Sequence, residues 1–116
     1  ALPISQIVKN SHHGLMKAKQ TIVAVCYDAK GRIVSQGQNS YTLTHPVQAR
    51  YAARASMPDR VFLHAEIAAI IRAKGKAIHK IVVKRYDKSG RLMLAKPCPV
   101  CQLAIKEAGI KVVVHS

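Results

Sequence analysis

The sequence predicts an α/β protein, in which helices pack on a mixed β-sheet to form a three-layer α/β/α sandwich. Three observations indicate this fold class. Runs of β-branched residues alternate with stretches of helical periodicity along the 116 residues. Near the start, two β-rich runs are joined by a tight turn, which predicts an antiparallel pair. Near the end, a strand, a helix and another strand follow one another, and this order predicts a right-handed parallel crossover.

The first half of the chain should begin with a helix over residues 4–19, where apolar residues recur on one helical stripe. Two β-rich runs follow at 21–28 and 32–38. They flank the sequence DAKG, which predicts a hairpin turn in which Gly31 adopts a positive φ. The length of the whole sequence fits one domain over residues 1–116.

The second half should supply the remaining helices and strands. In order, we expect a helix that Pro46 opens in VQARYAARAS, a helix over 64–74, a strand over 80–86, a helix over 98–108 and a final strand, IKVVVHS. Gly75 and Gly109 should end the two later helices. DKSG should turn the chain, and RLMLAKP should continue in an extended form. The sheet therefore has four strands, or five as the alternative.

The charge of the chain is strongly unbalanced. There are 19 Lys and Arg residues against 5 Asp and Glu residues, a formal net charge of +14. This excess favours contact with a polyanion, either single-stranded nucleic acid or a phosphorylated substrate, and the alternative is a solvated basic face. No apolar run approaches the roughly 20 residues that span a bilayer. The N-terminus ALPISQIVKN lacks a signal-peptide pattern, so we expect a cytoplasmic protein without membrane contact.

The three cysteines do not suggest a disulfide framework, because their number is odd. Cys26 lies within a β-rich run and should be a small buried hydrophobic residue. Cys98 and Cys101 are spaced i, i+3 at the start of a helix, so both can bind one metal ion. Prolines suit the first turn of a helix, and the positive helix end favours thiolate over thiol.

A histidine at the start of another helix completes the predicted metal centre. His64 with Cys98 and Cys101 would give zinc three protein ligands and leave its fourth position for water, as in catalytic zinc sites. Glu66 lies in the same turn as His64 and is predicted to accept a proton from that water. The alternatives are a closed structural zinc site, for which His79 and His115 are the spare ligands, or two core cysteines with an unrelated histidine.

With HAE at 64–66 and PCPVC at 97–101, the chain resembles the zinc-dependent nucleobase deaminases, whose signature is H-x-E followed by P-C-x-x-C. The segments HPVQARYA, LHAEIAAI and AKPCPVC also resemble small stand-alone deaminases of tailed phages. The resemblance implies a cytidine deaminase-like fold, one Zn²⁺ per chain and hydrolytic deamination at C4 of cytosine or C6 of adenine. For a phage protein, the location would be the host cytoplasm.

The same resemblance implies several substrate contacts. Asn39 matches a position where family members use asparagine to bind the sugar, although an ordinary turn residue is the alternative. Phe62 would pack against the base, with burial in the core as the alternative. The backbone N–H groups of Ala65 and Glu66 would bind a base carbonyl. Pro97, which precedes the first cysteine, is also expected to contact substrate.

The resemblance ends at the C-terminus. Family members usually continue with a further strand, whereas this sequence ends at Ser116. The fold could be minimal, a tail could be lacking, or a neighbouring subunit could cover the edge strand in a homo-oligomer.

Four functions are compatible with the sequence. We expect first a deaminase of cytosine in a cytidine or deoxycytidine nucleoside or nucleotide. The second is a deaminase of cytosine in single-stranded DNA or RNA, which the charge favours and the scarcity of aromatic residues disfavours. The third deaminates adenosine in RNA. The fourth is a zinc-containing nucleic-acid-binding module, against which the glutamate of HAE counts.

Overall fold

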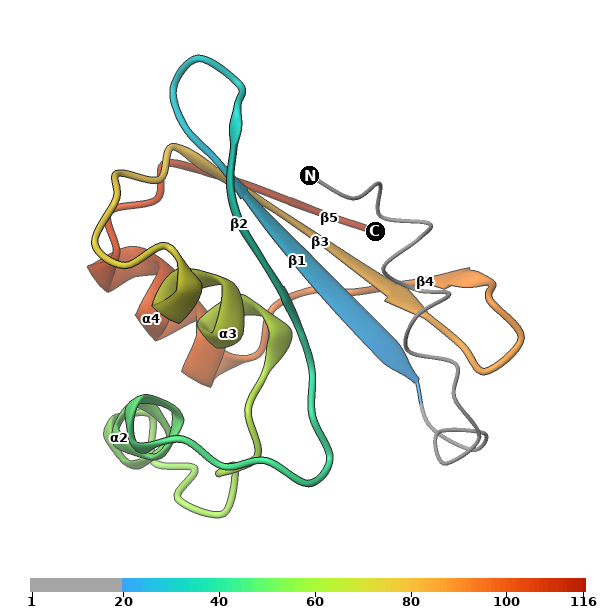
Figure 1. Cartoon of the computed structure of the whole chain (residues 1–116). Helices are drawn as coiled ribbons and strands as arrows, with labels where there is room; N and C mark the ends of the chain where they lie inside the picture. The colour runs from blue at the N-terminus through green and yellow to red at the C-terminus, as the bar shows by residue number, and fades with distance from the viewer. Residues whose placement is uncertain (1–19) are drawn as a thin grey trace.

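The computed structural model describes residues 20–116, which form one sheet with three helices (Figure 1). The elements follow in the order β1 (Thr21–Tyr27), β2 (Ile33–Gln38), α2 (Pro46–Arg54), α3 (Ala65–Arg72), β3 (Lys80–Tyr86), β4 (Leu92–Met93), α4 (Pro99–Glu107) and β5 (Val112–His115). Each predicted helix and strand from residue 20 onward is confirmed to within a few residues. The helix expected over 4–19 lies outside the described residues.

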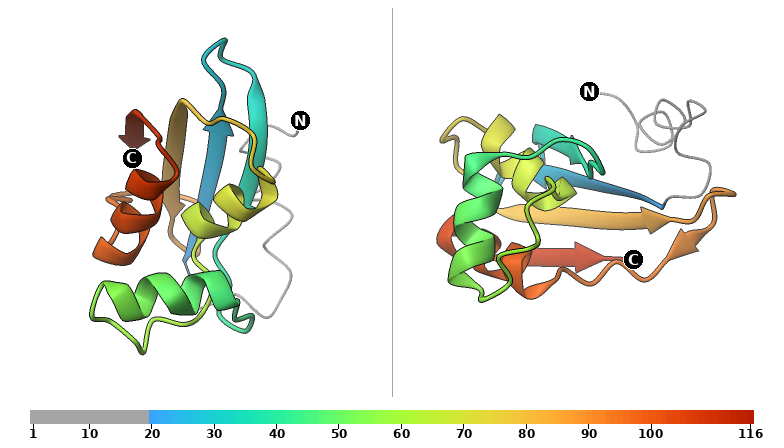
Figure 2. Two further views of the ribbon diagram at one scale, coloured as in Figure 1. Left: turned by 90° about the vertical axis from the view of Figure 1, so that its left-hand side faces the viewer. Right: turned by 90° about the horizontal axis from the view of Figure 1, so that it is seen from below.

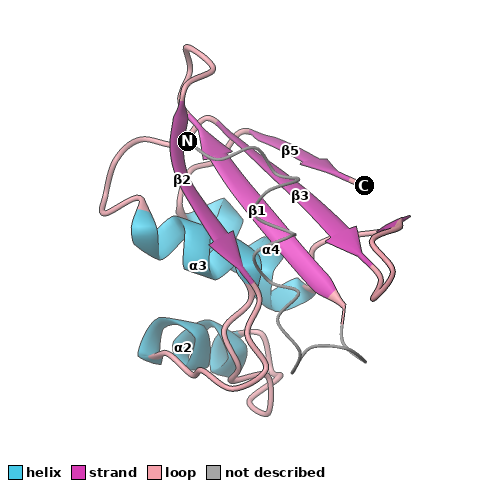
Figure 3. Cartoon of the chain, turned by 45° about the vertical axis from the view of Figure 1, so that its right-hand side comes forward, coloured by secondary structure: helices cyan, strands magenta, loops and turns pink. Residues whose placement is uncertain are grey.

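The five strands form a mixed sheet with the order β2-β1-β3-β4 (Figure 3). The strands β1 and β2 pair antiparallel, as do β1 and β3. The last strand, β5, runs parallel to β3, with Lys80 opposite Val112, so the predicted parallel crossover is confirmed. Because β5 pairs with the start of β3 and β4 pairs with its end, both lie on the same edge of β3. The five-stranded alternative is therefore the correct one.

The additional strand, β4, follows a second hairpin turn that matches the first. The sequence YDAKGR after β1 recurs as YDKSGR after β3. In each turn the aspartate Oδ1 accepts backbone N–H groups from the residues two and four positions later. Gly31 and Gly90 have φ of +80° and +88°, a region that suits glycine. The predicted turn at DKSG is confirmed. Within the following segment RLMLAKP, only Leu92–Met93 pairs with β3, and these two residues form β4.

The main core lies between one face of the sheet and the helices (Figure 2). Ala24 and Cys26 of β1 and Ile81 and Val83 of β3 pack there with side chains of α3 and α4. Cys26 is fully buried, as predicted. Val23 and Val25 point to the opposite face and are also buried, so the sheet buries apolar side chains on both faces.

A glycine in β2 brings α3 unusually close to the sheet. A Cβ atom at Gly37 would lie 2.5 Å from the Ala65 carbonyl oxygen and from the Ala69 nitrogen. Real Cβ atoms do not approach so closely, so only glycine permits this packing. Nearby, the Ser35 hydroxyl donates a hydrogen bond of 2.7 Å to the Ala69 carbonyl. Together, these two contacts fix the position of α3, and with it the side chains at its start.

The edge strand β5 carries exposed apolar side chains. Val112, Val113 and Val114 are 38–45% exposed.

Within residues 20–116, no helix is long and apolar enough to cross a membrane.

Candidate metal centre and active site

The three predicted ligands meet at the starts of α3 and α4. His64 is the N-cap of α3, and Cys98 is the N-cap of α4. The His64 Nδ1 atom lies 3.2 Å from Cys101 Sγ and 3.5 Å from Cys98 Sγ. All three ligand atoms lie within 4.8 Å of one another. Two segments more than 30 residues apart therefore converge on one point, because α3 and α4 pack side by side.

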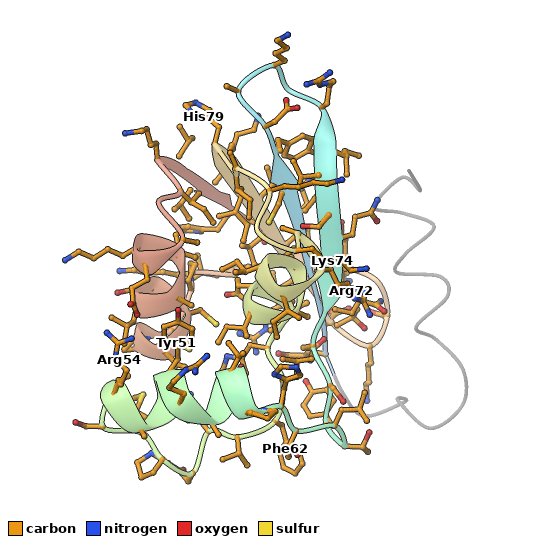
Figure 4. The ribbon with its side chains drawn as sticks, turned by 60° about the vertical axis from the view of Figure 1, so that its left-hand side comes forward. Tyr51, Arg54, Phe62, Arg72, Lys74 and His79 are labelled. Atoms are coloured by element: carbon orange, nitrogen blue, oxygen red, sulfur yellow. The ribbon has the colours of Figure 1, made fainter. Side chains whose placement is uncertain are left out.

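The donor set fits a zinc ion. A tetrahedral zinc ion with bonds of about 2.1 Å to nitrogen and about 2.3 Å to sulfur separates those atoms by about 3.6 Å. The two N–S distances are close to this value. Among residues 20–116, the cluster contains one imidazole, two thiols and no fourth ligand. His79 and His115, the spare candidates, border other pockets, and Figure 4 shows His79 at the opposite end of the molecule from Phe62.

The pKa values of the two cysteine thiols are shifted in opposite directions. A hydrogen bond from the Cys101 thiol, together with one from His64, lowers the pKa of Cys98 to about 3. The same hydrogen bond and burial raise the pKa of Cys101. The Cys98 thiolate in turn raises the pKa of the His64 imidazole through their hydrogen bond. One ligand is therefore already anionic, and binding of a dication would release the protons of the others.

The carboxyl group of Glu66 is buried beside this cluster. Glu66 is in the first turn of α3 and is 5% exposed. It lines a pocket of about 250 Å³ together with His64 and Cys98. Burial raises its pKa, because the ionised form is poorly solvated there. A buried carboxyl group with a raised pKa can both accept and donate a proton near neutral pH.

A buried glutamine holds the backbone of His64. Gln48 on α2 is fully buried. Its Oε1 accepts the His64 N–H at 3.1 Å, and its Nε2 donates to the Arg60 carbonyl at 2.9 Å. Both ends of the amide are thus used to fix the loop that leads into α3. Sequence reasoning missed Gln48, because a polar residue in a short amphipathic helix carries no signal of burial.

Gly37 was also missed, although it left a signal in the sequence. A glycine inside a β-rich run often marks a site where another backbone approaches closely. Here the approaching backbone is that of α3, one turn after His64.

The four predicted substrate contacts have different surroundings. Asn39 and Phe62 line a second pocket of about 260 Å³, which also reaches His64. Phe62 is 47% exposed and is not a core residue. The Asn39 amide accepts the Ile22 N–H at 2.8 Å and donates to the Gln20 carbonyl at 3.3 Å, so it also secures the start of β1.

The other two are buried next to the ligands. Ala65 is fully buried as the first residue of α3. Pro97 is buried just before Cys98 and borders a separate groove along β5. Contact of any of the four residues with substrate stays a prediction.

Comparison with known families agrees with this fold and metal centre, which are those of a zinc-dependent hydrolase. Residues 4–116 match the family model described as the cytidine and deoxycytidylate deaminase zinc-binding region. The chain belongs to this family and is thus a zinc-dependent deaminase of the cytidine and deoxycytidylate type. A comparison with curated proteins gave no match.

Proposed function

We propose that the protein removes the amino group of cytosine by hydrolysis in a cytidine or deoxycytidine nucleoside or nucleotide. Water enters and ammonia leaves, so that cytosine becomes uracil. The observation that carries this proposal is the buried carboxyl group of Glu66 on the wall of the pocket that also exposes His64 and Cys98. His64, Cys98 and Cys101 would hold the zinc ion, which lowers the pKa of a bound water and supplies a nucleophile at neutral pH.

The residues of the chain would move the protons and hold the base. Glu66 accepts a proton from the attacking water and donates it to the ring nitrogen next to the reacting carbon. It then carries a second proton from the added hydroxyl group to the departing amine. The exposed ring of Phe62 supplies an apolar wall on the adjoining pocket. Ala65, Pro97 and Asn39 remain candidates for contacts with the base and sugar.

Ammonia release by the zinc-loaded protein tests the proposal. The substrates should include cytidine, deoxycytidine, their monophosphates, adenosine and short single-stranded oligonucleotides. We expect a cytosine compound to be the best substrate. Glu66→Ala should keep one equivalent of zinc and lose at least about 100-fold in kcat, because general acid–base catalysis is removed. Ammonia release by this variant at the parent rate would show that Glu66 is not the proton carrier.

Cytosine within single-stranded DNA or RNA is a second candidate substrate. The net charge of +14 favours it. The aromatic ring of Phe62, which is 47% exposed and lines the adjoining pocket, could stack against a base. Turnover of an oligonucleotide faster than any free nucleoside or nucleotide would establish this alternative.

A further inference from the structure

Three cationic side chains border the pocket at the metal centre. Arg60 comes from the loop before α3, Arg85 from the end of β3, and Lys96 from the loop before α4. The same pocket is lined by His64 and Glu66. Arg60 also borders the adjoining pocket with Phe62, where Asp59 supplies a carboxylate, so the excess of positive charge is confined to the pocket at the metal centre. Three separate segments thus bring a cation to one small space.

Among the described residues, no carboxylate forms an ion pair with any of these three cations. Within residues 20–116, the ion pairs join Asp28 to Arg32 and Glu107 to Arg54, both away from this pocket. Glu66 is the one acidic residue that lines the pocket. It carries at most one negative charge against the three cations. The two thiolates would offset the charge of a bound dication, so the three side chains leave the pocket with a net positive charge.

Arg85 is the most informative of the three, because it is partly buried. Its Nη2 donates to Gln20 Oε1, while its Nε is buried and has no hydrogen-bond partner. A buried guanidinium N–H without an acceptor destabilises the protein. An apolar residue would avoid this cost on the core-facing side of β3, where Ile81 and Val83 precede it. A charged side chain at this position is explained if it binds an anionic ligand.

From these observations we infer that the substrate carries a phosphate group, which Arg60, Arg85 and Lys96 bind while the base enters the metal centre. The inference rests on the proposed deaminase function. Phosphate oxygens accept charge-assisted hydrogen bonds from arginine and lysine. The phosphate can come from the monoester of a free nucleotide or from the backbone of a single strand. A nucleoside without phosphate leaves all three cations without a counterion.

Selectivity measured on matched variants tests the inference. Arg85→Gln and Lys96→Gln should each lower kcat/KM for deoxycytidine monophosphate about tenfold, the usual effect of losing a hydrogen bond to a charged group. The kcat/KM for deoxycytidine should fall much less, so the preference for the monophosphate over the nucleoside should shrink in both variants. The controls Arg50→Gln and Lys88→Gln remove the same charge from exposed sites elsewhere and should affect neither substrate. If Arg85 had a purely structural role, Arg85→Gln would lower kcat/KM equally for both substrates. That result would show that Arg85 does not bind the phosphate.

The two sources of phosphate are separated by a third substrate, a short oligodeoxythymidylate with one central deoxycytidine. If the monoester is recognised, deoxycytidine monophosphate reacts fastest, and added salt weakens its binding only modestly. If the diester is recognised, the oligomer reacts fastest, and its binding falls steeply with salt. Either result supports a phosphate-binding pocket. Deoxycytidine reacting as well as both phosphorylated substrates would overturn it.

Binding measured without turnover distinguishes this inference from the proposed function. Isothermal titration calorimetry on zinc-loaded Glu66→Ala should show tighter binding of deoxycytidine monophosphate than of deoxycytidine. If no cytosine compound is deaminated by the parent but this preference is present and is lost in Arg85→Gln, the proposed function fails and the phosphate pocket stands. Equal affinities, or no binding of the monophosphate at millimolar concentrations, would overturn the inference.

Discussion

The carboxylates at the metal centre and at the hairpin turns have opposite environments. Glu66 is buried, and burial raises its pKa. Asp28 and Asp87 accept backbone N–H groups of their own turns at the surface, and these hydrogen bonds lower their pKa values. Each turn is formed by five consecutive residues. The environment of Glu66, in contrast, depends on contacts among β2 and all three helices, so distant substitutions should affect the metal centre far more than the turns.

Loss of a metal ligand should have the largest effect. Cys98→Ser should abolish stoichiometric zinc binding and activity. Because zinc binding is coupled to folding, Tm should fall by more than about 10 °C. Zinc content by mass spectrometry and thermal unfolding check both effects. The control is Cys26→Ala, which changes a fully buried cysteine outside the cluster and should retain zinc. One equivalent of zinc retained by Cys98→Ser would contradict the ligand assignment.

Substitution of Gly37 should be the next most damaging. Gly37→Ala places a Cβ atom 2.5 Å from backbone atoms of α3, so α3 must move away from β2. We expect a loss of about 3 kcal/mol in the free energy of unfolding, together with weaker zinc binding.

The matched control is Gly90→Ala in the second hairpin, where a Cβ atom meets nothing within 4 Å and only the positive φ opposes it. Its cost should be about 1 kcal/mol with zinc binding intact. Urea unfolding and zinc titration compare the two variants, and equal effects on zinc affinity would remove the special role of the β2–α3 contact.

Gln48→Ala should have a smaller effect that is concentrated on the metal centre. It leaves the His64 N–H and the Arg60 carbonyl without their partner, at a cost of about 2 kcal/mol. Since these bonds orient the loop before α3, zinc affinity should fall about tenfold. Gln36→Ala on β2 serves as the control. A competition titration with a chelator measures the affinity, and an unchanged value in Gln48→Ala would show that His64 is positioned without it.

Substitutions in the turns should have the smallest effect, and that effect should depend on pH. The folded protein lowers the pKa of Asp28, so its carboxylate stabilises the fold at neutral pH, and this contribution is lost as pH falls through the lowered pKa. Asp28→Asn should therefore be slightly less stable than the parent at pH 7, with kcat unchanged. The difference should vanish in acid. A difference that persists below the lowered pKa would mean that the charge is not the cause.

Local patterns were sufficient to predict much of this molecule. HAE and PCPVC each open a helix, and a helix start fixes the direction of its first side chains, so the ligand cluster could be predicted from two short motifs. The parallel pairing of β5 with β3 followed from chain order alone. The strand β4 could not be predicted from its two residues, although a turn at DKSG and an extended segment after it were expected.

Features that depend on tertiary contacts were not predictable. The burial of Gln48 depends on how α2 packs on the loop before α3, and the exposure of Phe62 depends on where that loop runs. In the sequence, nothing distinguishes Arg85 from the other 18 Lys and Arg residues. Its place beside the metal centre results from the pairing of β3 with β1, where Arg85 lies opposite Ile22.

Zinc-edge X-ray absorption spectroscopy of the zinc-loaded protein tests the arrangement on which all other conclusions depend. We predict two sulfur atoms at about 2.3 Å and two lighter atoms at about 2.0 Å, with one imidazole ring among the lighter ligands and water as the other. A third sulfur, or a second imidazole in place of water, would show a closed structural site and would contradict the account.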